Sequence, residues 1–209
     1  MGFEHNCNSG HCDHQPSADD SISCNLFSKI DLENVKCLNE EIDGSCKKVF
    51  RPYDDRLNRE HFVKSDIDQD LLFHIPFSGT VKLKSLVLIG SNDESHPFKA
   101  KLFKNKPDLT FDNVNIECDQ EINLAKDPDG QIAYPLKTVK FSSINHLSIY
   151  IPRNYANDDD LPTRVYYIGL NGEFMGALRP QAIITSYESQ ANPADHKLEF
   201  TKHVFQDIS

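Results

Sequence analysis

Residues 71–90 read LLFHIPFSGTVKLKSLVLIG and contain a period-two apolar pattern. Side chains on an extended strand point to opposite sides in turn, so residues two apart share a side. The apolar residues at alternate positions are Leu71, Phe73, Ile75 and Phe77, and then Val81 and Leu83. Residues 86–89 are apolar throughout, which is typical of a strand that is buried on both faces. The stretch therefore predicts the start of a sheet core.

The register constrains the turn inside this stretch. If Ser78-Gly79 alone formed a turn, Lys82 would lie opposite Ile75 on the apolar face. A three-residue loop of residues 78–80 pairs Ile75 with Leu83 and keeps lysine off that face. The alternative is that the two strands belong to different sheets of a sandwich. Both alternatives predict a β-protein.

Further short strands are predicted along the chain. We expect them at residues 99–104, 116–124, 144–151, 165–170 and 182–187, with a last one marked by Leu198 and Phe200. Asn171-Gly172 is the strongest short hairpin-turn dipeptide, so it is expected to end the strand before it. No long segment has the 3.6-residue period of an amphipathic helix. We therefore predict an all-β protein, a β-sandwich of about eight to ten short strands.

The 209 residues fit one domain with tails. We expect a flexible polar tail at residues 1–25, a sandwich domain at 26–200 and a C-terminal tail at 201–209. The net charge is −10, with 22 Lys and Arg scattered against 32 Asp and Glu, which argues against direct nucleic-acid binding. No apolar run reaches the roughly 20 residues of a membrane helix, and the polar start is no signal peptide. We expect a monomer of the cytoplasm and nucleus whose six cysteines are thiols.

Soft metal ligands are concentrated near the N-terminus. Zn²⁺ prefers thiolate and imidazole ligands, and this segment offers His5, Cys7, His11, Cys12 and His14. Their spacing is irregular, and no second cysteine pair closes a tetrahedral site. We expect a tail that scavenges zinc weakly, with a defined metal site as the alternative. No other cofactor is expected.

The sequence lacks the common catalytic motifs. It has no C-x-x-C dithiol, no G-x-S-x-G elbow and no H-E-x-x-H pair. Lys47 and Lys48 follow Cys46 and would lower the pKa of its thiol, but a small buried or loop thiol is the simpler interpretation. His74 and His146 fall on outward strand positions, where solvated histidines are expected.

A ligand-binding sandwich, for carbohydrate or calcium, is the alternative function. Asp66, Asp68 and Asp70 have the alternate spacing of part of a calcium loop. They lack the central glycine and distal glutamate of the EF-hand, so solvated turn carboxylates are expected. Sugar sites usually stack the sugar on Trp or exposed Tyr, whereas this chain has no Trp and 13 Phe against 7 Tyr.

Several runs in one order resemble the PITH domain, the module named for the proteasome-interacting thioredoxin family. They span about residues 28–200, and the polar His/Cys-rich start resembles the stand-alone members that carry no thioredoxin domain. The runs are Cys37-Leu38-Asn39-Glu40, Ser65-Asp66, Asp70-Leu71-Leu72-Phe73, Ile75-Pro76-Phe77, Val81-Lys82-Leu83-Lys84, Ser95-His96-Pro97, Leu102-Phe103-Lys104-Asn105, Phe141-Ser142, His146-Leu147-Ser148-Ile149, Tyr167-Ile168-Gly169-Leu170, Tyr187-Glu188 and Ala191-Asn192-Pro193-Ala194-Asp195-His196.

The resemblance implies a jelly-roll sandwich similar to galactose-binding-like domains. It further implies a non-enzymatic protein-interaction module that associates with the 26S proteasome and affects transcription and differentiation indirectly. The family has no established catalytic residues, so none are assigned here. In such a sandwich Pro76 can lie at a strand edge or a bend without breaking a central ladder.

Two segments are candidate partner contacts. The first is the loop at residues 189–196, with Asn192, Pro193, Asp195 and His196. Its alternative is a well-fixed turn. The second is the C-terminal segment with Phe205 and Ile208, which would add to a partner's groove or sheet edge. Its alternative is a final strand packed on its own domain.

Overall fold

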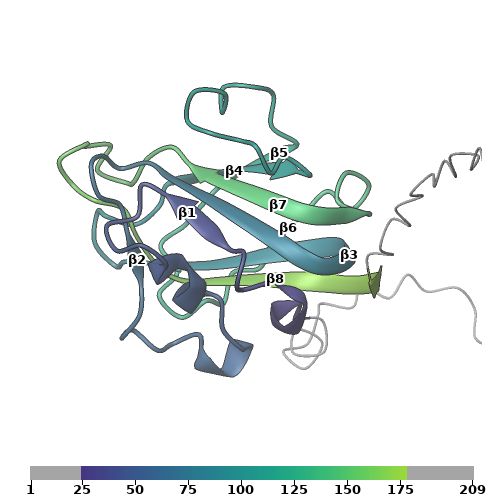
Figure 1. Cartoon of the computed structure of the whole chain (residues 1–209). Coiled ribbons are helices and arrows are strands. Elements are labelled where there is room, and N and C mark those ends of the chain that lie inside the picture. The colour runs from purple at the N-terminus through teal and green to yellow at the C-terminus, as the bar shows by residue number, and fades with distance from the viewer. Residues whose placement is uncertain (1–24, 178–209) are drawn as a thin grey trace, which may run out of the picture. The chain divides into compact units, whose positions relative to one another are not determined.

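The computed structural model describes residues 25–177, which form short 3-10 helices and antiparallel strands (Figure 1). The helices are η1 Phe27–Lys29, η2 Ser45–Val49 and η3 Tyr53–Asp55. The strands are β1 Lys36–Leu38, β2 Val63–Lys64, β3 Leu71–Gly90, β4 Lys99–Lys104, β5 Gln120–Asn123, β6 Tyr134–Pro135, β7 Ile144–Ile151 and β8 Arg164–Ala177. Within this part of the chain, no helix is long and apolar enough to cross a membrane.

β3 is one 20-residue strand that bends near its middle and takes part in two layers (Figure 1). Its first arm, residues 71–76, pairs with β7 and β1, and β7 continues the layer through β4 to β5. Its second arm, residues 79–90, pairs with β8 and β6, and β8 continues to β2. The predicted three-residue loop is therefore wrong, because residues 79 and 80 pair with β8. The structure has the alternative arrangement, in which the two halves serve different layers of a sandwich.

The main hydrophobic core lies between these layers. The first arm of β3 contributes Phe73 and Ile75, and the second arm contributes Leu83 and Leu86. Leu83 and Leu86 both face this core although they are three residues apart. The reason is a shift in the β3–β8 register between Leu83 and Ser85, where one extra residue flips the side-chain alternation.

The second arm of β3 is buried on both faces, as its sequence predicted. Leu86 and Leu88 join the main core, whereas Val87 and Ile89 form a smaller cluster with Tyr167 on the other face. The alternating apolar pattern thus identified the core residues correctly, even though the bend was not foreseen.

Gly79 lies at the bend of β3, where the backbone approaches β8 closely. A Cβ at this position would overlap the carbonyl oxygen of Gly176 and the ring of Phe174. Pro76 forms the last regular pair with β7 before the bend, opposite His146, and the register shifts after it. The proline therefore occupies a strand irregularity, where its missing N–H is tolerated.

The hairpin turn predicted at Asn171-Gly172 is wrong, because β8 continues through this dipeptide to Ala177. Gly172 pairs with Leu83 and lies so close to the second arm of β3 that a Cβ would overlap the carbonyl oxygen of Lys82. The glycine thus permits a close approach between two strands rather than a turn.

The other strand predictions hold where the structure describes them. The strands expected at 99–104 and 144–151 are β4 and β7, and the one expected at 116–124 is shorter, as β5. The strands predicted at 182–187 and around Leu198 and Phe200 lie outside the described residues, as do nearly all of the two predicted tails.

Candidate functional site

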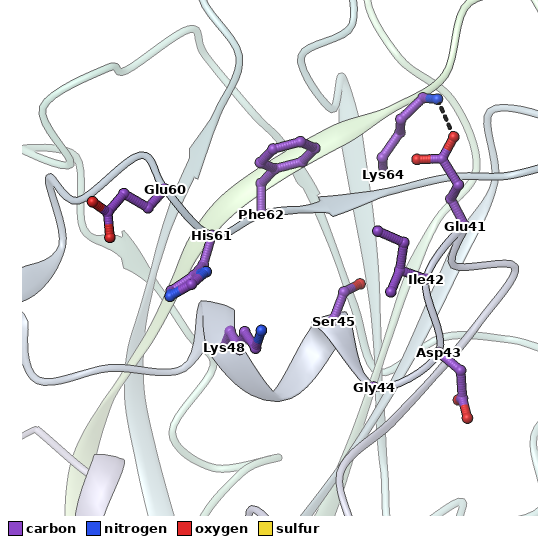
Figure 2. Close-up of a pocket in the computed structure, with 10 residues that line it drawn as sticks. All are labelled: Glu41, Ile42, Asp43, Gly44, Ser45, Lys48, Glu60, His61, Phe62 and Lys64. Carbon is purple, nitrogen blue, oxygen red and sulfur yellow. Dashed lines mark hydrogen bonds and ion pairs between the residues drawn. The ribbon is translucent and has the colours of Figure 1, made fainter.

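A surface pocket of about 180 Å³ lies between two segments, one of which contains the short strand β2 (Figure 2). The first segment, residues 41–48, follows β1 and runs into helix η2. The second, residues 60–64, leads into β2. We call this feature the 41–64 pocket. Its lining includes the apolar Ile42 and Phe62, the polar or basic Ser45, Lys48, His61 and Lys64, and the acidic Glu41, Asp43 and Glu60.

The carboxylate of Glu40 fixes the first segment of the pocket. It accepts hydrogen bonds from the backbone N–H of Gly44 and the backbone N–H of Cys46, each at 2.8 Å. It also accepts one from the Ser45 hydroxyl at 2.7 Å. Gly44 has a φ of 79°, a left-handed conformation that glycine adopts readily. The side chain of Glu40 therefore holds the turn that leads into η2.

The two segments are joined through their backbones. The N–H of Glu41 donates to the carbonyl of Lys64 at 2.9 Å, and Glu40 forms an isolated β-bridge with Ser65. An ion pair between Lys64 and Glu41 closes the same end of the pocket (Figure 2). These contacts fix the distance between the walls.

Two exposed apolar side chains line the pocket. Ile42 is 68% exposed and Phe62 is 39% exposed. One side of Phe62 packs against Tyr166, with ring centroids 5.5 Å apart, and Tyr166 is covered in turn by the guanidinium of Arg59. Phe62 is thus anchored while part of its ring remains open to solvent.

Unpaired cationic or basic groups lie at the other end. Within residues 25–177, no hydrogen bond or ion pair engages the side chain of Lys48 or of His61. Lys48 and His61 both line the pocket, whereas the carboxylates of Asp43 and Glu60 point outward from it in Figure 2. The pocket therefore combines an apolar wall with an uncompensated ammonium group.

Cys46 lies in η2 next to Ser45 of the pocket lining, and its surroundings disfavour the thiolate form. Its side chain is fully buried. Burial and the nearby Glu40 carboxylate raise the pKa of its thiol to about 12. Lys47 lowers this pKa by a smaller amount. The lowered thiol pKa that the sequence suggested from Lys47 and Lys48 is therefore outweighed by burial and Glu40. The simpler interpretation, a buried thiol, is confirmed.

His74 is buried, contrary to the prediction, and His146 is half-buried. Their rings lie on neighbouring strands with centroids 5.5 Å apart. The connection between β4 and β5 covers this face, placing Leu109 and Val114 in a cluster with residues of β3, β4 and β7. Burial lowers the pKa of His74, and burial together with His74 lowers the pKa of His146 to about 4.

The described neighbours of this histidine pair include the Asp108 carboxylate, whose charge acts on both rings, and the Ser148 hydroxyl. The Ser148 hydroxyl lies 3.4 Å from His74 Nδ1 but donates to the carbonyl of Lys106 at 2.9 Å. Its proton is therefore committed to the backbone. In the described part of the chain, no three His, Cys, Asp or Glu side chains are grouped so that they could hold a metal ion.

The acidic turn before β3 is used for local hydrogen bonds. The Asp68 carboxylate accepts from the side-chain amide of Asn39 at 2.6 Å and from the backbone N–H of Asp70 at 3.1 Å. The Asp70 carboxylate accepts from the Tyr150 hydroxyl at 2.5 Å, and burial raises the pKa of Asp70. Asp66 and Asp68 are exposed turn carboxylates as predicted, whereas Asp70 is half-buried.

The site residues predicted from the sequence all lie outside the described residues. They are His5, Cys7, His11, Cys12 and His14 for metal, and Asn192, Pro193, Asp195, His196, Phe205 and Ile208 for partner contact. The 41–64 pocket was not predicted. The one signal for it was the presence of the apolar Ile42 and Phe62 in mostly polar segments without apolar periodicity.

Comparison with known proteins identifies relatives of this chain over nearly its whole length. The family model described as PITH domain matches residues 16–191. The "PITH domain-containing protein CG6153" of Drosophila melanogaster is 48% identical over 202 residues, which cover 94% of each chain. The "PITH domain-containing protein 1" of Homo sapiens is 43% identical over 184 residues, covering 88% of this chain and 86% of that protein.

Among solved structures, the fold is similar to carbohydrate-binding modules. The structure of the CBM32-1 and CBM32-2 domains of Clostridium perfringens ZmpB in complex with GalNAc matches with a TM-score of 0.52 and 9% identity. The match covers 74% of this chain and 38% of that one. This likeness shows the fold, a jelly-roll β-sandwich of the galactose-binding-like type, and confirms the predicted class.

Proposed function

Because this chain belongs to the PITH domain family, we propose that it is a non-enzymatic protein-interaction module that associates with the 26S proteasome. The single observation that carries the proposal is the family match over residues 16–191. Relatives of similar length cover the same span, so the domain is the main part of those proteins too. The family takes its name from a proteasome-interacting thioredoxin, and this sequence lacks the C-x-x-C dithiol of a thioredoxin.

The described surface supports a binding role. The 41–64 pocket presents Ile42 and Phe62 on a backbone that Glu40 holds in place. A few side chains that become fully buried contribute most of the binding free energy in protein interfaces, and apolar side chains on a fixed backbone are suited to that role. The net charge of −10 favours partners with basic surfaces. Such surfaces would contact parts of the module other than the 41–64 pocket. We propose that the protein acts as a monomer in the cytoplasm and nucleus and affects transcription and differentiation only indirectly.

Carbohydrate binding, the alternative, has less support. The ZmpB domains form a complex with GalNAc, and that complex is a property of ZmpB. At 9% identity the likeness concerns the backbone fold and not the residues of a sugar site. We therefore do not propose a sugar ligand for this chain.

The proposal is tested by affinity capture from cell lysate followed by quantitative mass spectrometry. The bait is the full chain with an affinity tag, and the control is a tagged CBM32 domain, which has a similar fold. We expect proteasome subunits to be enriched at least tenfold over the control. Equal recovery of proteasome subunits with both baits would contradict the proposed function.

A further inference from the structure

We propose that the 41–64 pocket docks a short acidic peptide segment of a partner protein, in which one large apolar side chain lies next to a carboxylate. This inference rests on the proposed function, because it names the chemistry that the interaction module would recognise. It assigns the apolar side chain to the space between Ile42 and Phe62, and the carboxylate to Lys48.

The size of the pocket favours a side chain over a small-molecule ligand. Its volume is about 180 Å³, whereas small-molecule sites usually enclose roughly 300–1,000 Å³. A single Leu, Ile or Phe side chain is of the right size for such a space. Ile42 is 68% exposed on one wall, and Phe62 is 39% exposed on the other, so an inserted side chain would remove apolar area from water on both sides.

The charges around the pocket favour an acidic neighbour for that side chain. The Lys64 ammonium is already paired with Glu41. Lys48 has no such partner among the described residues, and it lines the pocket together with His61 (Figure 2). Since the carboxylates of Asp43 and Glu60 point outward, the group that faces the pocket without a counter-charge is cationic. A peptide carboxylate near Lys48 would supply that counter-charge, and a lysine or arginine there would be repelled.

The backbone of both pocket segments is held in place by hydrogen bonds before any ligand binds. The three hydrogen bonds to Glu40 and the link from Glu41 N–H to the Lys64 carbonyl fix both walls before a ligand arrives. Binding therefore orders few additional groups on this side of the interface, which reduces its entropic cost. A short peptide with one anchor would otherwise bind too weakly to be specific.

The inference is tested with three fluorescein-labelled eight-residue peptides, which share Gly-Ser flanks and differ in their core. The cores are Leu-Asp-Glu, its neutral counterpart Leu-Asn-Gln, and its anchorless counterpart Gly-Asp-Glu. Binding to the full chain is followed by fluorescence polarisation and by amide chemical shifts in ¹⁵N-labelled protein. We expect saturable binding of the Leu-Asp-Glu peptide, at least tenfold weaker binding of the other two, and shifts concentrated at residues 41–48 and 60–64.

Two variants and two matched controls assign the binding to the pocket. Ile42→Ser and Lys48→Glu are each expected to weaken binding of the Leu-Asp-Glu peptide at least tenfold. The controls are Val139→Ser, at a residue 90% exposed in another loop, and Lys137→Glu at an exposed lysine beside it; both should stay within twofold. Circular dichroism melting curves establish that all four variants fold, since each replaces an exposed side chain.

Other outcomes would overturn the inference. These are equal binding of the acidic and neutral peptides, shifts outside the pocket, or absence of saturable binding. Dimerisation of the wild-type chain that Ile42→Ser abolishes would assign the pocket to a second copy instead. If the peptide fails to bind while the chain still captures proteasome subunits, the inference is wrong and the proposed function stands. If the peptide binds but no subunits are captured, the pocket inference stands and the proposed association with the proteasome is wrong.

Discussion

His74 on β3 and His146 on β7 lie side by side, with their ring centroids 5.5 Å apart and their ring planes inclined by 43°. His74 is buried and His146 is half-buried on the face covered by the chain that connects β4 to β5, and a proton on one ring would lie next to the other. The pKa of each is lowered mainly by burial, to about 4 for His146. The surrounding charges act in opposite senses, because Lys36 lowers the pKa of His74, whereas Asp108 raises the pKa of both. The pair is therefore neutral at pH 7.

This pair makes the stability of the domain sensitive to mild acid. A histidine with a lowered folded-state pKa binds fewer protons than in the unfolded chain, where its pKa is about 6.5. The free energy of unfolding must then decrease as the pH falls below about 6.5, and the loss continues down to the folded pKa near 4. We expect a loss of about 1 kcal/mol between pH 7 and pH 5, a figure reduced for the partial exposure of His146. Urea denaturation at each pH measures it.

The matched variants for this effect are His146→Gln and His61→Gln. The first removes the most perturbed titration and should flatten the pH dependence between pH 7 and pH 5. The second replaces an exposed histidine of the 41–64 pocket and controls for the loss of an imidazole away from the pair. A slope that is the same in the wild type and in His146→Gln would show that the pair does not control acid stability.

Removing the Glu40 carboxylate should loosen the wall of the pocket. Glu40→Ala leaves the N–H groups of Gly44 and Cys46 and the Ser45 hydroxyl without their shared acceptor. We expect the free energy of unfolding to fall by about 2 kcal/mol, since hydrogen bonds to charged groups are among the stronger ones. Glu41→Ala is the control, because it removes only an exposed ion pair with Lys64 and should cost about 0–1 kcal/mol. Equal losses in the two variants would contradict the anchoring role of Glu40.

A methyl group at the bend of β3 should destabilise the sandwich. In Gly79→Ala the new Cβ overlaps the Gly176 carbonyl oxygen and the Phe174 ring, and the backbone oxygen cannot rotate away. We expect a loss of about 1–3 kcal/mol, the range for overpacking. Ser78→Ala, next to it, changes an exposed residue that donates one hydrogen bond to the Lys29 carbonyl and should stay within about 1 kcal/mol. Thermal melting of both variants tests this, and an unchanged melting temperature in Gly79→Ala would refute the close contact.

Thiol labelling should distinguish the described cysteines. Cys37 and Cys46 are buried, and burial raises the pKa of both thiols, to about 12 for Cys46. Cys118 is partly exposed. With iodoacetamide at pH 8, followed by peptide mapping, we expect Cys118 to react in the native protein and the other two only after unfolding. Rapid labelling of native Cys46 would instead indicate that the region above it opens.

The sequence predicted those parts of the fold that depend on neighbouring residues. The alternation through Phe73 and Ile75 identified the core face of β3, because a period-two pattern is a local property. The bend at Gly79 could not be predicted in the same way. It exists because β8 brings Phe174 and Gly176 against it from far along the chain. For the same reason Asn171-Gly172 was mistaken for a turn, since a close approach to the Lys82 backbone leaves no mark in the local sequence.

The 41–64 pocket could not be predicted from such local sequence patterns. Ile42 and Phe62 lie in segments without apolar periodicity, and a backbone hydrogen bond between Glu41 and Lys64 brings those segments together. The outward positions of His74 and His146 were assigned correctly to the face opposite the main core. That His74 is buried and His146 half-buried follows from the covering connection with Leu109 and Val114, whose path is set by tertiary packing.

The most direct test of the account is binding of the purified full chain to purified 26S proteasome, followed by glycerol-gradient sedimentation. We expect the wild-type chain to migrate with the proteasome in a saturable, stoichiometric manner. We also expect the combined Ile42→Ser and Lys48→Glu variant to need at least tenfold more protein for the same occupancy. A wild-type chain that remains at the top of the gradient at micromolar concentrations of both components would contradict the proposed function.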